Sequence, residues 1–85
     1  MRIDQIEYVV AAHQQQSISQ AAESLFVTQP SLSRAIAALE KELGVQLFHR
    51  TYQGASLTSV GEKLLPHFEA ILEETHRINA VLAEE

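Results

Sequence analysis

The sequence has no cysteine and no tryptophan, and only two prolines and three glycines among its 85 residues. Without cysteine it has no disulfide, no thiol nucleophile and no cysteine-based zinc or iron–sulfur site. Long apolar runs are missing too: none is longer than the run at residues 8–12, which is too short for a signal-peptide core or a membrane span. We therefore expect one small cytoplasmic domain, without a membrane segment, whose core is held by packing alone.

Basic residues are also scarce, with six Lys and Arg against eleven Asp and Glu and a net charge of −5. This balance argues against a protein that coats polyanions in general. The acids are unevenly spread, however. Residues 59–85 carry a net charge of −4, residues 28–58 carry +1, and no acid occurs in residues 24–39 or 43–61. The middle of the chain therefore remains suited to an anionic partner.

Capping residues predict two helices in the first 25 residues. Asp4 and Glu7 have the spacing of a capping box at the start of the first helix. Ser17 and Gln20 repeat this spacing and predict a short second helix, roughly Ile18 to Leu25. Two alanines inside the second helix leave room for another helix to cross it closely.

A third helix is predicted over residues 28–43. Thr28 suits its N-cap, and Pro30 falls in the first turn, where the missing N–H removes no intrahelical bond. Gly44 stands where a helix commonly ends. One apolar stripe runs along this helix and consists of Leu32, Ala35, Ile36, Leu39 and Leu43. The opposite face carries short or hydrogen-bonding side chains instead of a wall of charge.

Helical signals stop after Gly44, and residues 45–58 have the pattern of a short extended hairpin. Leu47, Phe48 and Leu57 are its expected buried contacts. Gln53–Gly54 is the expected tip, because glycine tolerates the backbone angles of tight turns.

A long final helix is predicted from Thr58 or Ser59 onward, with Ser59 and Glu62 as a capping box. Pro66 predicts either a local kink or a helix that starts later, near Pro66 itself. An apolar seam with heptad spacing is formed by Leu64, Phe68, Ile71, Thr75, Ile78 and Leu82. A seam that extends well beyond a small domain favours pairing with a second copy over packing within one chain.

A short helix, a tight connection and a second helix with an uncharged outer face match a helix-turn-helix, and the hairpin would be its wing. Gln29 can pair with adenine and Arg34 with guanine, while Pro30 and Ser33 are small enough to let the helix approach the bases. The helix start around Thr28 and Ser31 would also favour a phosphate. A well-capped helix without a ligand is the alternative explanation for this segment.

These residues resemble the N-terminal DNA-binding domain of LysR-type transcriptional regulators in register over nearly the whole chain. The matching motifs are Ser17-Ile18-Ser19-x-Ala21-Ala22, Leu25-x-Val27-Thr28-Gln29-Pro30-Ser31-Leu32-Ser33-Arg34, Leu39-Glu40-x-x-Leu43-Gly44-Val45-x-Leu47-Phe48-x-Arg50 and Leu57-Thr58-x-x-Gly61. The resemblance implies a mainly α fold, in which residues 1–58 form a bacterial winged helix-turn-helix of three helices and a short β-hairpin wing. Residues 59–85 would form a linker helix that pairs two subunits.

The resemblance also implies roles for single residues. Gln29, Pro30, Ser33 and Arg34 would face bases in the major groove, with Thr28 and Ser31 near phosphates. Arg50 at the start of the wing would contact the DNA backbone. Separately from the resemblance, His49 lies beside Arg50 and could contact phosphate when protonated. Gln53 is the candidate for the minor groove, although relatives often carry Arg or Lys where residues 52–56 have none. The implied partner is promoter DNA with an interrupted palindrome. Relatives continue into an effector domain that this chain lacks, so we expect it to be part of a longer protein.

Other functions have weaker support. The four histidines show no spacing typical of a metal site, and no catalytic nucleophile, base or cofactor loop emerges, so we expect neither an enzyme nor a cofactor or metal. The main alternative is a winged helix that binds another protein, because the net charge is −5 and the last helix is long. Binding to DNA that weakens with salt would separate the two hypotheses.

Overall fold

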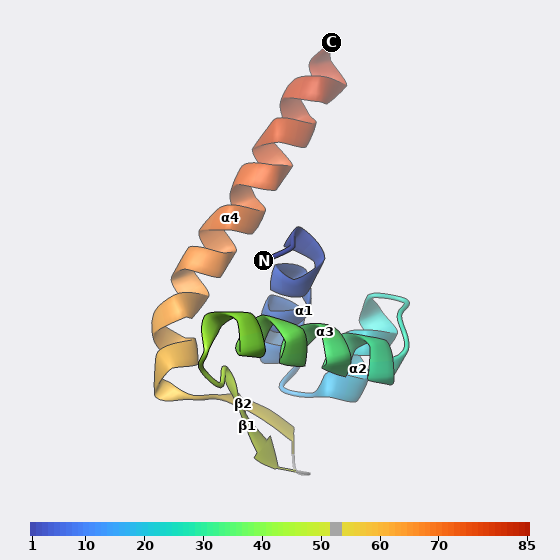
Figure 1. Ribbon diagram of the computed structural model, residues 1–85. Coiled ribbons are helices and arrows are strands. Elements are labelled where there is room, and N and C mark those ends of the chain that lie inside the picture. The colour runs from blue at the N-terminus through green and yellow to red at the C-terminus, as the bar shows by residue number, and fades with distance from the viewer. Residues whose placement is uncertain (52–53) are drawn as a thin grey trace.

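The computed structural model describes the whole chain except residues 52–53, and of Arg50 and Thr51 it describes the backbone alone. The elements in chain order are α1 (Ile3–Gln15), α2 (Ile18–Ser24), α3 (Gln29–Leu43), β1 (Phe48–Thr51), β2 (Gly54–Leu57) and α4 (Ser59–Glu84). Three short helices, a two-stranded hairpin and a long last helix confirm the expected winged helix-turn-helix with an appended helix (Figure 1).

Three of the predicted caps are confirmed. Ser17 accepts a hydrogen bond from the backbone N–H of Gln20 at 3.1 Å and begins α2. Thr28 accepts one from the backbone N–H of Ser31 at 3.2 Å and begins α3. Gly44 ends α3 with φ of 73°, in the left-handed region that glycine adopts without strain.

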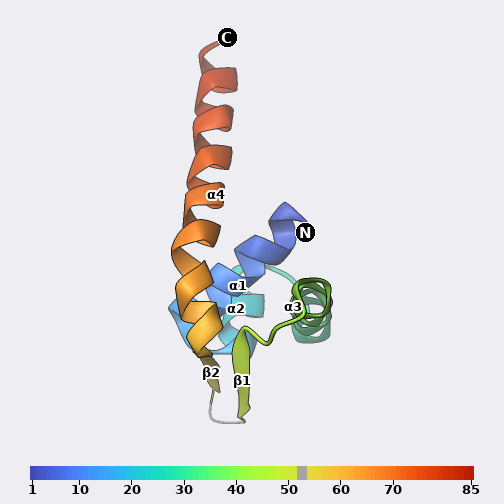
Figure 2. The ribbon, with the colours of Figure 1, turned by 60° about the vertical axis from the view of Figure 1, so that its left-hand side comes forward.

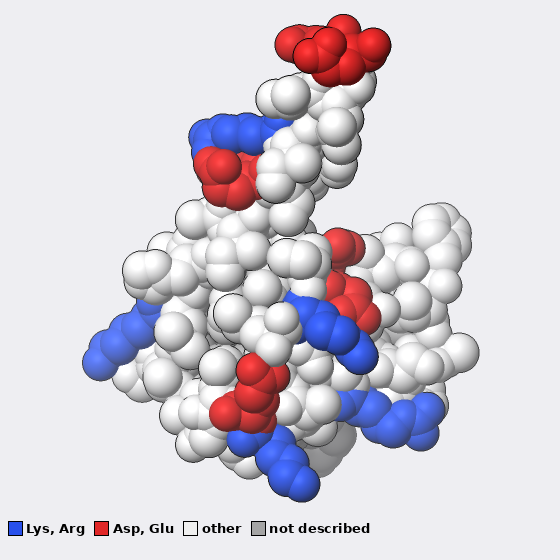
Figure 3. Space-filling view, turned by 45° about the horizontal axis from the view of Figure 1, so that its top comes forward, with Lys and Arg blue, Asp and Glu red and all other residues white. Residues whose placement is uncertain are grey.

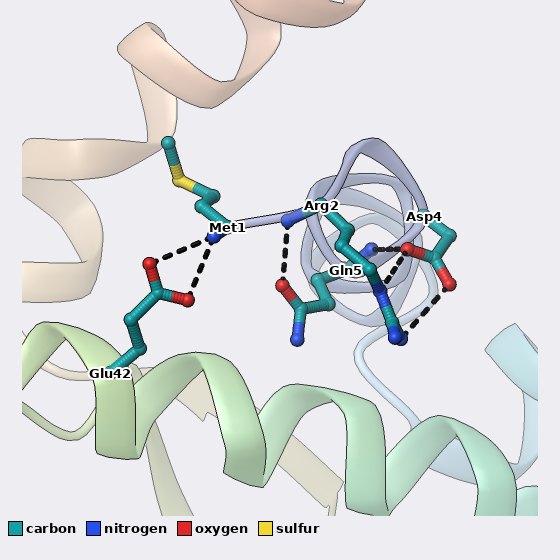
Figure 4. Close-up of polar contacts among 5 residues, drawn as sticks. All are labelled: Met1, Arg2, Asp4, Gln5 and Glu42. Carbon is teal, nitrogen blue, oxygen red and sulfur yellow. Dashed lines mark hydrogen bonds and ion pairs between the residues drawn. The ribbon is translucent and has the colours of Figure 1, made fainter.

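Two predicted capping boxes are wrong. Helix α1 begins at Ile3, so Asp4 lies inside its first turn. The side chain of Gln5 accepts a hydrogen bond from the backbone N–H of Arg2 at 2.8 Å and thereby takes the capping role (Figure 4). At the start of α4, Thr58 is the N-cap instead of Ser59, because its hydroxyl accepts from the backbone N–H of Gly61 at 3.1 Å.

The core lies where α1, α2 and α3 meet the base of the hairpin (Figure 2). Its fully buried side chains include Ile6, Val9, Ala12, Ala21, Leu32, Ile36, Leu39, Leu47 and Phe48. The apolar stripe of α3 thus faces inward except at its last residue, Leu43, which is 37% exposed, and the alanines of α2 lie under it without bulk. In addition, the terminal ammonium of Met1 binds both carboxylate oxygens of Glu42 at 2.8 Å, which ties the start of α1 to the end of α3 (Figure 4).

The hairpin is antiparallel, with Phe48 opposite Leu57 and His49 opposite Ser56. Successive side chains point to opposite faces of a strand. Phe48 and Ala55 are accordingly buried against the core, whereas His49 and Ser56 are exposed. Leu57 is half-buried on the same face as its partner Phe48, and the third predicted contact, Leu47, is buried just before β1. The predicted tip residue Gln53 lies outside the described residues.

Helix α4 rises from the foot of the hairpin and extends beyond the other helices (Figures 1 and 2). It begins at Ser59 and continues through Pro66 to Glu84, so the predicted late start does not occur. Arg77 donates hydrogen bonds to Glu74 and Glu73. The bond to Glu74, followed by the negative charges of Glu73 and Glu74, raises the pKa of Arg77 above its usual value. Acidic side chains gather at the free end, where Glu84 and Glu85 are exposed (Figure 3).

Candidate nucleic-acid interface

The outer face of α3 presents the four residues that were expected to contact bases. Gln29, Pro30 and Arg34 are exposed and Ser33 is half-buried. All four lie in the first two turns of α3: Pro30 and Arg34 are opposite the buried stripe, Ser33 is at its edge, and Gln29 precedes the stripe at the exposed start of the helix. No carboxylate occurs between Ser24 and Leu39, so this face offers amide, hydroxyl and guanidinium groups without a competing negative charge. Such groups match the hydrogen-bonding edges of bases.

The start of α3 is preorganised by Thr28 and Ser31. The hydroxyl of Thr28 accepts from the backbone N–H of Ser31 and donates to the hydroxyl oxygen of Ser31 at 2.8 Å. Ser31 therefore keeps its own hydroxyl hydrogen free to donate outward. Pro30 has no N–H, and Leu32 donates its N–H to the carbonyl of Thr28. The Ser31 hydroxyl and the Gln29 N–H are thus the donors that this turn can offer to a phosphate.

The wing presents His49 on its exposed face, next to Ser56 on the paired strand. The backbone of Arg50 belongs to β1, opposite Ala55, but its side chain and the whole of Gln53 lie outside the described residues. Their expected contacts with DNA therefore stay predictions.

Hydrogen bonds to Glu40, Gln16 and Leu47 hold the wing in place. The carboxylate of Glu40 on α3 accepts from the backbone N–H of Leu47 at 2.7 Å and of Phe48 at 3.3 Å. The backbone N–H of Ala55 donates to the carbonyl of Gln16 at 3.3 Å, and that of Thr58 to the carbonyl of Leu47 at 2.9 Å. The wing is therefore fixed relative to α3, which lets both contact one ligand together.

Glu40 is a positioning residue that sequence reasoning missed. It is 7% exposed although it carries a carboxylate. The spacing held a signal, because Glu40 follows Ile36 by four residues and so shares its inward face. A charged residue on a buried face needs a partner, and the two backbone N–H groups of the wing supply one.

Phe26 was also missed. It lies in the connection between α2 and α3, with φ of 58° and a side chain that is 96% exposed. A bulky side chain at positive φ is strained. Its sequence position gave no sign of this, because Leu25, Phe26 and Val27 form one short apolar run in which only the outer two are partly buried.

The seam of α4 divides into two parts. Leu64 and Ile71 are half-buried and Phe68 is 4% exposed, so this part packs on the core of its own chain. Ile78 and Leu82 are 58% and 66% exposed, and Thr75 between the two parts donates its hydroxyl to the carbonyl of Leu72 at 2.6 Å. Phe68 has almost no surface left for a second chain. The part of the predicted seam that is open therefore lies at its C-terminal end, beside the exposed Val81.

Other kinds of site find little support in the described residues. No group of three His, Asp or Glu side chains in that part of the chain is placed to hold a metal ion. No helix among the described residues is long and apolar enough to cross a membrane.

Comparison with known proteins identifies the family. Residues 3–62 match the model of the bacterial regulatory helix-turn-helix proteins of the lysR family. The chain is 42% identical over 74 residues to the uncharacterized HTH-type transcriptional regulator YybE of Bacillus subtilis, a match that covers 87% of this chain and 25% of YybE. It therefore spans about a quarter of the length of this curated relative.

Solved structures give the same answer. In the crystal structure of a CbnR_DBD–DNA complex, the protein superposes with a TM-score of 0.91 at 33% identity, covering 99% of this chain and 97% of that one. The BenM_DBD/catB site 1 DNA complex gives a TM-score of 0.93 at 31% identity, covering 99% and 94%. The chain belongs to the LysR family of bacterial helix-turn-helix regulators and comprises the DNA-binding domain of that family.

Proposed function

We propose that this chain binds double-stranded promoter DNA sequence-specifically, as a two-fold dimer on an interrupted palindrome. Helix α3, within residues 28–43, lies in the major groove, and the wing contacts the flanking backbone. The observation that carries this proposal is that Gln29 and Arg34 are exposed at the start of α3, within a stretch of sequence, residues 24–39, that has no carboxylate. The two complexes named above, in which similar chains are bound to DNA, support it.

The residues divide into three roles. Arg34 and Gln29 read base edges, because each can form two parallel hydrogen bonds to one base. Pro30 and Ser33 allow close approach, since neither projects far from the helix. Ser31, oriented by Thr28, donates to a phosphate, and His49 and Arg50 contact the backbone from the wing. Contacts with the phosphate backbone fix the position of the protein on DNA without reading the base sequence.

Dimerisation is proposed through α4. Ile78, Val81 and Leu82 are exposed on the part of the helix that extends beyond the body of the domain. An apolar stripe on a projecting helix is buried most simply by the same stripe of a second copy. In the full-length protein, the effector domain common in the family would follow this helix.

The test compares two labelled duplexes by fluorescence anisotropy: one recovered by selection from random-sequence DNA, and one of equal composition with a scrambled sequence. We expect the selected duplex to bind more tightly, and binding to weaken with salt with a slope on the order of 4–8 for the dimer, because few cations meet the phosphates. Arg34→Ala should cost about 1–3 kcal/mol on the selected duplex and bring the two affinities closer.

Two further variants sharpen this test. Arg50→Ala should weaken both duplexes alike, because a backbone contact does not depend on the sequence. Arg77→Ala is the matched control, since it also removes one guanidinium but from α4, where Arg77 binds Glu73 and Glu74. Equal losses on both duplexes for Arg34→Ala would contradict its base-reading role. Absence of any binding at 50 mM salt would favour the alternative, a winged helix that binds another protein.

A further inference from the structure

The joint between the body of the domain and α4 is held by Thr58. Its backbone N–H donates to the carbonyl of Leu47 at 2.9 Å, and its hydroxyl donates to the carbonyl of Gln46 at 2.6 Å. The same hydroxyl accepts from the backbone N–H of Gly61 at 3.1 Å. One residue thus fastens the first turn of α4 to the segment that leads from α3 into the wing.

Gly61 allows this turn to lie directly on that segment. The residue is buried, and a β-carbon built on it would overlap the carbonyl oxygen of Leu47 and lie 3.2 Å from Cδ2 of Leu57. The nearest obstacle is backbone, which cannot rotate aside as a side chain does. Its φ is not in the left-handed region, so glycine is needed here for space alone. Any larger residue would push the first turn of α4 away from Leu47.

A second point of support lies two turns later, at Phe68, which belongs to the core. At 1.5 Å per residue, the two supports are about 10 Å apart, and about 24 Å of helix follow Phe68 up to Glu84. Phe68 is the most deeply buried side chain of α4, with Ile71 and Leu72 packed on the core just beyond it, and we take it as the pivot about which α4 acts as a lever. A displacement of about 1 Å at Gly61 moves the far end by roughly 2 Å in the opposite direction.

We infer that Gly61 and Thr58 determine the spacing of the operator half-sites. This inference rests on the proposed function, because it requires pairing through the far part of α4. In such a dimer, the angle at which α4 leaves the body sets the distance of each α3 from the two-fold axis. A change in this angle occurs in both chains of the dimer, so it alters the distance between the two α3 helices twice. Successive base pairs are 3.4 Å apart, so a shift of about 1 Å at Gly61 corresponds to roughly one base pair of spacer.

The experiment measures affinity for duplexes that carry both half-sites of a selected operator, with spacers from about three base pairs shorter to three longer than the selected one. A duplex with a single half-site is included. For the wild-type chain we expect one preferred spacer. For Gly61→Ala we expect the optimum to move by one base pair or more, or the preference for the best spacer to fall about fivefold, with single half-site affinity kept within about twofold.

Gly44→Ala is the matched control. It also places a methyl group on a glycine, and it strains the backbone because φ is +73°, but nothing lies within 4 Å of the added atom. It should lower the stability of the fold and leave the preferred spacer unchanged. The preferred spacer length therefore distinguishes a role of Gly61 in positioning α4 from a role in stability alone.

Thr58→Val provides a second variant, which removes the hydroxyl bonds to Gln46 and Gly61 without adding bulk against Leu47. If Gly61→Ala does not fold, the spacer profile of Thr58→Val tests the inference in its place. A folded, dimeric variant with the wild-type profile overturns the inference. A wild-type chain without any spacer preference, or one that sediments as a monomer, contradicts the proposed dimer instead. The two failures are thus distinguishable.

Discussion

Glu40 places a carboxylate within an apolar core, where it stabilises the start of the wing. At the start of the wing, the backbone N–H groups of Leu47 and Phe48 donate to the Glu40 carboxylate instead of to a carbonyl of the other strand. Such charge-assisted bonds are stronger than bonds between neutral groups. A buried N–H that loses its acceptor costs the fold its full desolvation penalty.

We therefore expect Glu40→Ala to lower the free energy of unfolding by about 1–3 kcal/mol, since two buried N–H groups lose their acceptor. Glu40→Gln, which keeps one oxygen without the charge, should have a smaller effect. Urea unfolding measures both, with the exposed neighbour variant Lys41→Ala as the control. A Glu40→Ala protein as stable as the wild type would contradict this role.

Phe26 presents the opposite case, in which a side chain destabilises the fold. Its ring packs on almost nothing at 96% exposure, whereas its backbone is held at positive φ. Asparagine is several-fold enriched in this region of backbone space. Phe26→Asn should therefore raise the free energy of unfolding by about 1 kcal/mol.

Thermal unfolding tests this expectation, because about 1 kcal/mol raises the melting temperature of a domain of this size by roughly 4–8 °C. Phe26→Leu removes the ring but keeps the strain, and it should melt near the wild-type temperature. A lower melting temperature for Phe26→Asn would mean that the exposed ring contributes to packing.

At the scale of elements, the caps and apolar spacing were enough to place α2, α3 and the hairpin. Thr28, Gly44 and the stripe around Leu32 act locally, and local signals are visible in a sequence. The start of α1 was mispredicted because Gln5 forms a capping box with Arg2, which is not a usual N-cap residue, in place of the expected box of Asp4 and Glu7. The start of α4 was mispredicted because Thr58 is fixed by the distant carbonyl groups of Gln46 and Leu47. Contacts between segments decided the start of α4, whereas a local contact between Arg2 and Gln5 decided the start of α1.

The candidate interface was likewise predictable from the sequence only where local signals determine it. The outer face of α3 could be predicted, because helical periodicity separates it from the buried stripe. The strain at Phe26 and the buried carboxylate of Glu40 depend on how the segments meet. The same holds for the burial of Phe68, which periodicity alone assigned to the seam between chains.

Helix α4 carries the prediction about assembly. Ile78→Asp together with Leu82→Asp should give a monomer at tens of micromolar, because charge would replace the exposed apolar seam. The melting behaviour of the isolated fold should change little, since both side chains are already exposed within one chain. Sedimentation measures the mass.

The control for this variant is Ala80→Asp, which adds a charge to the same helix about 200° around from Ile78 and should leave the dimer intact. A double variant that sediments like the wild type would place the dimer contact elsewhere on the chain. Equal dissociation by Ala80→Asp would show a general charge effect on α4 instead of a seam.

At the scale of the whole molecule, the net charge of −5 becomes compatible with DNA because the charges are segregated. Residues 59–85 carry most of the negative charge, much of it on the exposed surface of α4 (Figure 3). The reading face of α3 and the described part of the wing carry none. Long-range attraction to DNA is therefore weak, and affinity has to come from a small number of well-placed contacts.

The most direct test of sequence-specific binding by a two-fold dimer is a selection experiment. The dimeric chain selects from a pool of random duplex DNA, and the bound duplexes are sequenced. We expect enrichment of two inverted half-sites, with centres one helical turn or a multiple of it apart. The Arg34→Ala protein should enrich the same spacing with a relaxed base preference in each half-site. Recovery of a single asymmetric motif, or no enrichment over the starting pool, would contradict a two-fold reader of promoter DNA.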